Sequence, residues 1–257
     1  MLSVLKKRYG MKILAFTFDN GFMPERTYIN IRNVTARLGI DHIFFKPDRT
    51  VLGKIFLSAA KASWYSPKAA ERASAICTTC IGLMKYAALK TAIYKNIPLI
   101  AFGWSPGQAP LSSAILKIHP DMIRSMEDVI KKPVTKIVGK KKAGIFFLGA
   151  RHYSRPDRFP YYVHPLSFSA YDEKKIFKEI KALGWKRPAG LDMNSTNCLL
   201  NSYAIKFHKE KYGFNPYAYE LAQLVREGAM SRKAAIARLN APISKRTLEA
   251  VRRKLKR

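Results

Sequence analysis

Residues 75–108 constrain the fold of this chain more than any other stretch. They read AICTTCIGLMKYAALKTAIYKNIPLIAFGWSPGQ, in which a helix-like run leads into a short apolar segment and then into a turn rich in Gly, Ser and Pro. In open α/β sheets, ligands bind outside the carboxyl ends of the strands, where such turns lie. We therefore expect residues 97–102 to form a strand, and residues 103–108 to border a binding crevice.

Short apolar runs alternate with helix-like segments in the first half of the chain. Residues 12–18 (KILAFTF) are of the kind buried on both faces of a parallel sheet. They are followed by a turn that starts at Asp19 and by an amphipathic helix that Gly39 ends. Residues 42–45 then predict a second strand and residues 51–63 a second helix. This alternation predicts an α/β fold with a doubly wound, mostly parallel sheet.

The last third of the chain has a helical pattern. Apolar residues recur at helical spacing over residues 176–183, and Ser231 and Ser244 precede two basic segments as expected helix N-caps. We expect residues 1–168 to form a nucleotide-binding α/β domain, with residues 111–160 as an insertion over one edge of the sheet, and residues 169–257 to form a helical region.

The net charge of the chain indicates a polyanionic partner. Lys and Arg number 47 against 17 Asp and Glu among 257 residues, a formal net charge of +30. Such an excess favours tRNA or another polyanion over a membrane surface; a generally basic proteome or adaptation to high salt is the alternative explanation. The residues MLSVLKKRYG lack the long apolar run of a secretory leader, so we expect none, and the longest apolar runs of the chain contain Lys or Pro. We expect a cytoplasmic protein that does not enter a membrane.

The three cysteines are candidates for metal or sulfur chemistry. Cys77 and Cys80 lie one helical turn apart, and Cys198 lies in the polar segment DMNSTNCLLNS. An odd count argues against a disulfide framework in a cytosolic chain. The thiols could ligate an iron–sulfur cluster, ligate zinc with His164 or His208 as fourth ligand, carry a persulfide, or be inert buried side chains.

Four segments together resemble the PP-loop ATP pyrophosphatase superfamily. They are KILAFTFDNGF, ICTTCIGLMKYAA, IAFGWSPGQ and YYVHPLSFSAYDEKKI. In that superfamily such segments form a strand beside the adenine, a Cys-x-x-Cys helix, the strand and glycine turn that close the nucleotide site, and a late strand with its helix. The resemblance implies that ATP, with Mg²⁺, is bound by Phe18, Asp19, Asn20, Gly103, Trp104, Ser105 and Gln108.

The cysteine pattern is similar to that of one branch, the PP-loop tRNA thiolases. In those enzymes three thiolates hold a four-iron cluster and leave one iron free to carry sulfur. The resemblance implies catalytic roles for Cys77 and Cys80, and ligation by Cys77, Cys80 and Cys198 of an iron–sulfur cluster rather than zinc. The segment LVREGAMSRKAAIARL is instead similar to the branch that contains N-acetyl sugar amidotransferases.

One defining motif of the superfamily is absent from the chain. The Ser-Gly-Gly-x-Asp-Ser loop, whose backbone N–H groups cradle the ATP phosphates, does not occur in the sequence. We expect the first, central strand of the sheet to be missing with it, because the start is truncated or misassigned. The alternative is a degenerate paralogue that binds no nucleotide.

The resemblance implies an AMP- and pyrophosphate-forming transferase, and the charge and cysteines favour sulfur transfer to a tRNA base. A sulfur-donor protein would then be a partner. The first alternative is an ammonia-dependent amidotransferase acting on a nucleotide-linked N-acetyl sugar, with ammonia from a partner glutaminase. The second is a non-catalytic RNA-binding protein.

Overall fold

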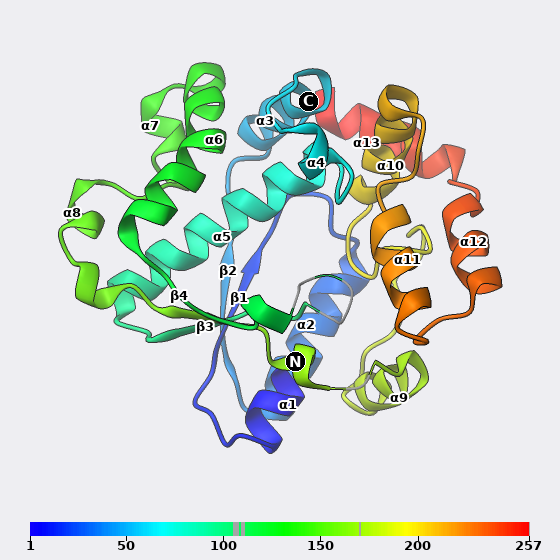
Figure 1. Ribbon diagram of the computed structural model, residues 1–257, viewed down its shortest axis with the longest axis horizontal. Helices are drawn as coiled ribbons and strands as arrows, with labels where there is room; N and C mark the ends of the chain where they lie inside the picture. The colour runs from blue at the N-terminus through cyan, green and yellow to red at the C-terminus, as the bar shows by residue number, and fades with distance from the viewer. Residues whose placement is uncertain (105–107, 109–110, 170, 257) are drawn as a thin grey trace.

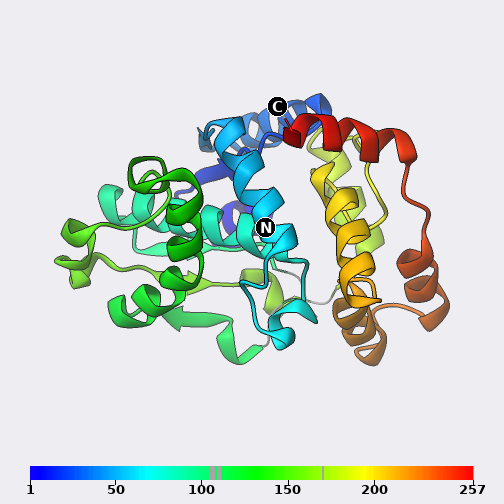
Figure 2. The same cartoon turned by 90° about the horizontal axis from the view of Figure 1, so that it is seen from above.

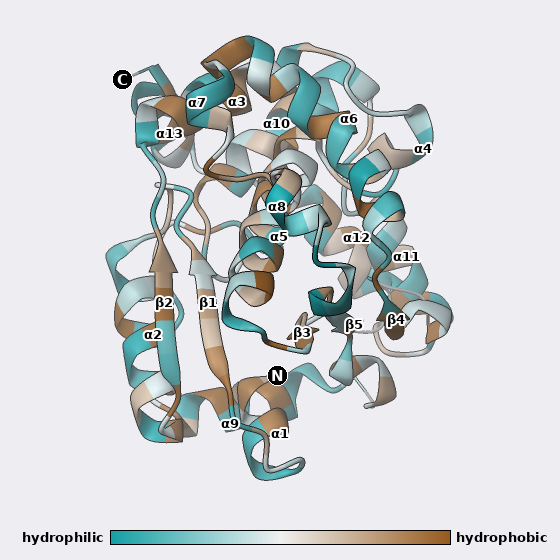
Figure 3. Cartoon of the chain, turned by 90° about the vertical axis from the view of Figure 1, so that its left-hand side faces the viewer, coloured by the Kyte–Doolittle hydropathy of each residue, from teal (hydrophilic) through white to brown (hydrophobic). Residues whose placement is uncertain are grey.

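The strands of this α/β protein form two small sheets. The computed structural model describes residues 1–104, 108, 111–169 and 171–256. β1 (Leu14–Phe18) pairs in parallel with β2 (Asp41–Phe45), and in a second sheet β5 (Tyr161–Val163) lies between β3 (Leu99–Ala101), which is parallel to it, and β4 (Ile115–Lys117), which is antiparallel (Figure 3). The parallel pairs agree with the α/β prediction. The expected single sheet is not formed by the described strands, because none of them bridges β1 and β3.

Helices surround these sheets on several sides (Figure 1). Their limits follow local signals: Ser74 caps the helix that begins at Ala75, Asn96 ends it with φ 54°, and Gly39 ends the earlier helix with φ 59°. The helices are α1 (Leu2–Lys7), α2 (Glu25–Leu38), α3 (Arg49–Lys61), α4 (Pro67–Ala70), α5 (Ala75–Lys95), α6 (Pro120–Val138), α7 (Lys140–Ala143), α8 (Ala150–Tyr153), α9 (Glu173–Ala182), α10 (Leu200–Tyr212), α11 (Ala218–Arg226), α12 (Arg232–Asn240) and α13 (Lys245–Lys256).

The long helix α5 runs through the middle of the molecule (Figure 1). By length and composition alone it is the one helix, among the described residues, that could cross a membrane, which the sequence reading did not anticipate. Half of its apolar stretch is buried inside the protein, and it packs against α3, α6 and α10. An apolar helix that packs against several neighbours is expected in the core of a large domain, and we describe α5 as the central core helix.

The main hydrophobic core joins segments from both ends of the chain. Phe22, Phe56 and Leu83 belong to it together with Val251 and Leu255 of α13. Helix α13 lies across one end of α3 (Figure 2). The two approach closely because α3 carries a glycine at this point, where an added Cβ would lie 3.0 Å from the carbonyl oxygen of Leu255. The helical residues after position 168 therefore contribute to the same core as the strands.

His208 should make the stability of the fold depend on pH. It is 3% exposed on α10, and neither ring nitrogen has a hydrogen-bond partner among the residues that the structure describes. Burial lowers its pKa below the usual 6.5, so the unfolded chain takes up a proton at higher pH than the folded protein, and stability falls as the pH drops through about 6.5. We expect His208→Phe to show a smaller loss of urea midpoint between pH 7.5 and pH 5.5 than the wild type. The exposed His119, changed to Gln, should leave the loss unchanged; equal losses in all three proteins would contradict the assignment.

Candidate functional site

Three cysteine side chains meet at the carboxyl end of β1. The amide nitrogen Nδ2 of Asn20 lies 3.2 Å from Sγ of Cys198 and 3.6 Å from Sγ of Cys80, and can donate to either. The thiol of Cys77 lies 3.5 Å from Oδ1 of Asn201 on α10. The structure thus brings Cys77, Cys80 and Cys198 together with Asn20, although Cys198 is 178 residues from Asn20 in sequence.

Local capping interactions position the sulfurs. Ser74 Oγ accepts a hydrogen bond from the backbone N–H of Cys77 at 3.1 Å, which fixes the first turn of α5, and Cys80 follows one turn later. Ser195 holds Cys198 in a reciprocal pair: its Oγ accepts from the Cys198 N–H and donates to the Cys198 carbonyl, both at 3.1 Å. Each sulfur is therefore held by a defined backbone turn.

A network around Asp192 supports the thiols and was not found by sequence reasoning. The carboxylate of Asp192 accepts hydrogen bonds from Nδ2 of Asn201 at 3.0 and 3.1 Å and from Oγ of Ser202 at 3.1 Å. Oδ1 of Asn201, the oxygen that faces Cys77, also accepts from the hydroxyl of Tyr217 at 2.9 Å. The available signal was the polar segment DMNSTNCLLNS around Cys198, which begins with Asp192.

The thiols are protonated at neutral pH in this environment. Burial raises the pKa of Cys77 to about 12, and burial likewise raises the pKa of Cys80 and of Cys198. A buried neutral thiol is a poor nucleophile, because the thiolate is the reactive form. A bound metal ion or cluster would supply the positive charge needed to deprotonate these groups.

The donor chemistry of the three sulfurs fits a soft metal or an iron–sulfur cluster. As arranged, however, the described residues contain no group of three His, Cys, Asp or Glu side chains positioned to hold one ion. The Asn20 amide lies between two of the sulfurs, so ligation by all three requires this side chain to turn away. Neither His164 nor His208 completes a ligand group with the cysteines among the described residues.

The Asp19 carboxylate, from the residue before Asn20, is almost fully buried, with 1% exposure. It accepts hydrogen bonds from the hydroxyl of Tyr28 at 2.7 Å and the N–H of Gly21 at 2.9 Å, and Lys46 lies 3.8 Å away. The charge of Asp19 also acts on Lys254 of α13, whose pKa burial lowers. Asp19 is therefore a carboxylate held by hydrogen bonds, with the basic side chains of Lys46 and Lys254 nearby.

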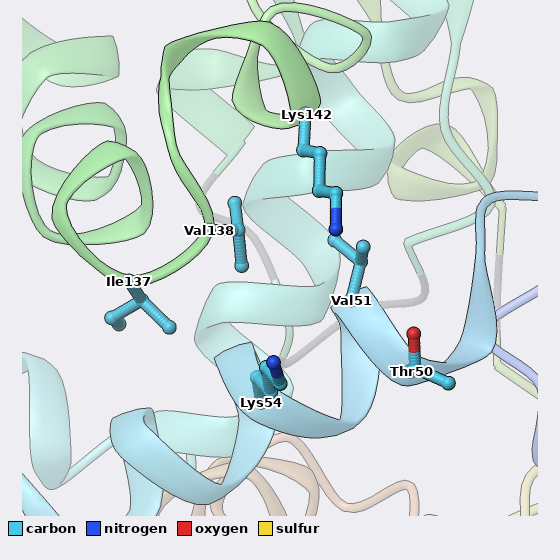
Figure 4. Close-up of a pocket in the computed structure, with 6 residues that line it drawn as sticks. All are labelled: Thr50, Val51, Lys54, Ile137, Val138 and Lys142. Carbon is cyan, nitrogen blue, oxygen red and sulfur yellow. The ribbon is translucent and has the colours of Figure 1, made fainter.

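Further basic side chains follow along α3 and beside it; with Lys46 and Lys254 we call them the basic rim. Arg49 lies over Gly21, where an added Cβ would be 3.2 Å from its Cγ. Further along, Lys54 and Lys142 border a surface hollow between α3 and the α6–α7 turn (Figure 4). With Lys46 and Lys254, these residues place positive charge near the thiols and on the adjoining surface.

The other predicted nucleotide contacts lie in two places. Phe18 is a core side chain, 8% exposed and stacked on Phe45 with ring centroids 5.8 Å apart, so its ring is used for packing. Gly103 and Trp104 follow β3; Gly103 is exposed, and the Trp104 ring stacks on Phe102 with centroids 6.3 Å apart. Gln108 contacts Glu220 of α11, and Ser105 lies outside the described residues.

Comparisons with known proteins provide a distant relative without a known activity. No protein-family model matches the chain. An uncharacterized protein of Methanocaldococcus jannaschii is similar to it, with 24% identity over 254 residues that cover 98% of this chain and 72% of the relative. The similarity extends over nearly the whole chain, so the segments that carry the thiols fall within the aligned length.

Proposed function

We propose that this protein is an ATP-dependent, pyrophosphate-forming transferase of the PP-loop type that transfers sulfur to a base of tRNA. One observation carries the proposal: Cys77, Cys80 and Cys198, far apart in the sequence, meet around Asn20 at a strand end. Convergent thiols without a disulfide are typical of metal or sulfur chemistry. A doubly wound PP-loop fold and a cytoplasmic location are parts of the same proposal.

The chemistry requires ATP, with Mg²⁺, and a sulfur donor. A carbonyl oxygen of the base attacks the α-phosphorus of ATP, and pyrophosphate leaves. A hydrosulfide-level sulfur from a donor protein attacks the activated carbon, its proton passes to solvent, and AMP leaves with the original oxygen. An iron–sulfur cluster held by the three cysteines would provide the iron that binds the incoming sulfur.

The protein's own residues have separate tasks in this proposal. The three thiols bind the sulfur-carrying group, and Asn20, which donates to two of the sulfurs, holds them in place before that group binds and turns away when it does. The basic rim, formed by Lys46, Arg49, Lys54, Lys142 and Lys254, attracts tRNA phosphates. Because phosphate contacts position a nucleic acid without reading its sequence, we assign base selection to the thiol site rather than to the rim.

Anaerobic purification followed by an activity assay tests the proposed function. We expect brown protein containing iron and sulfide, which releases pyrophosphate from ATP in the presence of tRNA and sulfide and yields a thiolated nucleoside detectable by mass spectrometry. Pyrophosphate release with amino sugar nucleotides and ammonia would instead indicate the amidotransferase. Colourless protein that binds tRNA but releases no pyrophosphate with either substrate would indicate the non-catalytic alternative.

A further inference from the structure

Another cluster of polar groups lies at the edge of the β3–β5–β4 sheet, and several of its atoms have no hydrogen-bond partner among the described residues. β3 and β5 are parallel, with Ala101 opposite Val163, so the residues that follow them leave the sheet at the same edge. Phe102 and Trp104 follow β3, and His164 follows β5, with its ring 5.9 Å from the ring of Phe102. This edge is the carboxyl end of the parallel pair, where α/β sheets bind ligands.

Lys85 of α5 brings a positive charge to this edge. Its ammonium lies 5.1 Å from the ring centroid of Phe102 and 5.6 Å from that of Trp104. Among the described residues no carboxylate forms an ion pair with it. Burial lowers the pKa of Lys85, and no neighbouring acid offsets this effect. The aromatic faces stabilise the cation only partly.

Two buried acceptor or donor atoms in the same region also lack partners. His164 is 8% exposed, and its Nδ1 makes no hydrogen bond with any described residue. Oγ of Ser167, in the turn that follows, is likewise buried without a partner. Burial, together with the charge of Lys85, lowers the pKa of His164, so its ring is neutral and can donate from one nitrogen. A buried polar group without a partner destabilises the folded protein, and a ligand that pairs with the group removes this penalty.

We propose that Lys85 and His164 bind the phosphate group of a nucleoside monophosphate, and that Trp104 contacts its ring system. An oxyanion is the ligand that both a lone ammonium and an unpartnered imidazole N–H can bind at once. The half-buried indole next to the cation offers a surface for a planar ring. This inference rests on the nucleotide part of the proposed function but not on the thiols, and it assigns Lys85 and His164, two residues that sequence reasoning did not place at a nucleotide site.

Calorimetric titration of the full-length protein with AMP, adenosine and inorganic phosphate tests this site. We expect AMP to bind at least about tenfold more tightly than adenosine, because a charge-assisted hydrogen bond is worth about 1.5–3 kcal/mol. Lys85→Met should weaken AMP binding at least about tenfold and leave adenosine binding unchanged. Lys95→Met, which removes an exposed charge from the same helix, should bind AMP as the wild type does.

A second substitution keeps the test informative if Lys85→Met does not fold. Lys85→Arg keeps the positive charge, so this variant should bind AMP with most of the wild-type affinity. Equal AMP binding by the wild type and Lys85→Met would overturn this inference and leave the proposed function standing, as would equal binding of AMP and adenosine. If the protein binds AMP in a Lys85-dependent way but does not thiolate tRNA, the proposed function is wrong and this inference stands.

Discussion

The Cys198→Ser protein, purified without oxygen, is expected to bind iron at least about tenfold more weakly than the wild type, since loss of even an outer-shell partner typically costs 10–100-fold in metal affinity. Serine keeps the shape of the side chain but replaces the soft sulfur ligand with a hard hydroxyl. Cys198 is the ligand that joins the C-terminal region to α5, because its sulfur and that of Cys80 flank the same Asn20 amide. The measurement is iron and acid-labile sulfide per chain, together with the yield of thiolated nucleoside.

The matched control for this substitution is Met193→Leu. Met193 carries sulfur in the same segment but is 55% exposed, so its replacement should leave iron binding and thiolation unchanged. Asn20→Ala removes the amide hydrogen bonds to Cys80 and Cys198 without removing a thiol, so it should retain most of the iron that Cys198→Ser loses. Iron retained at the wild-type level in Cys198→Ser would show that the three cysteines do not share a metal site.

Local sequence signals predicted much of the fold. The run at residues 12–18 contains β1, and the expected N-caps Ser231 and Ser244 accept hydrogen bonds from Ala234 N and Thr247 N at the starts of α12 and α13. These features depend on neighbouring residues, which a sequence displays directly. The resemblance also implied that the three cysteines share one site; they lie close to Asn20 and Asn201 in the structure, and their ligation of a metal stays a prediction.

Features that depend on long-range contacts were not predicted. β4 is three residues long and pairs with β5, with Lys117 opposite Tyr161, which comes 44 positions later in the sequence, and nothing in its sequence distinguishes it from a loop. The Asp192 network depends on α10 and Tyr217 meeting the same loop. The surroundings of Lys85 were not predicted for a related reason, because the residues around it follow two strands outside α5. Partners of this kind are fixed by packing and leave no local pattern.

The second large effect is expected on stability. Glu127 on α6 is fully buried, and its carboxylate accepts hydrogen bonds from the N–H of Leu148 at 2.7 Å, Lys131 at 3.0 Å and the hydroxyl of Tyr153 at 3.1 Å. Glu127→Ala removes the one acceptor that all three donors share. Breaking a buried ion pair by deleting one partner costs about 3–5 kcal/mol, so we expect a loss near the lower end, about 3 kcal/mol, because Lys131 is partly exposed and can reach water.

The adjacent pair provides a control in the same helix and with the same spacing. Asp128 and Lys132 lie 3.3 Å apart, but their side chains are 42% and 78% exposed. Exposed pairs of this type contribute about 0.3–0.5 kcal/mol. In urea titrations, the loss of unfolding free energy in Asp128→Ala should therefore be several-fold smaller than the loss in Glu127→Ala. The difference between the two variants measures what burial adds to one carboxylate, because charge, helix position and partner type are matched. Similar losses in both would show that Glu127 does not organise the contact between α6 and the α8 segment, and that water reaches its donors once the carboxylate is gone.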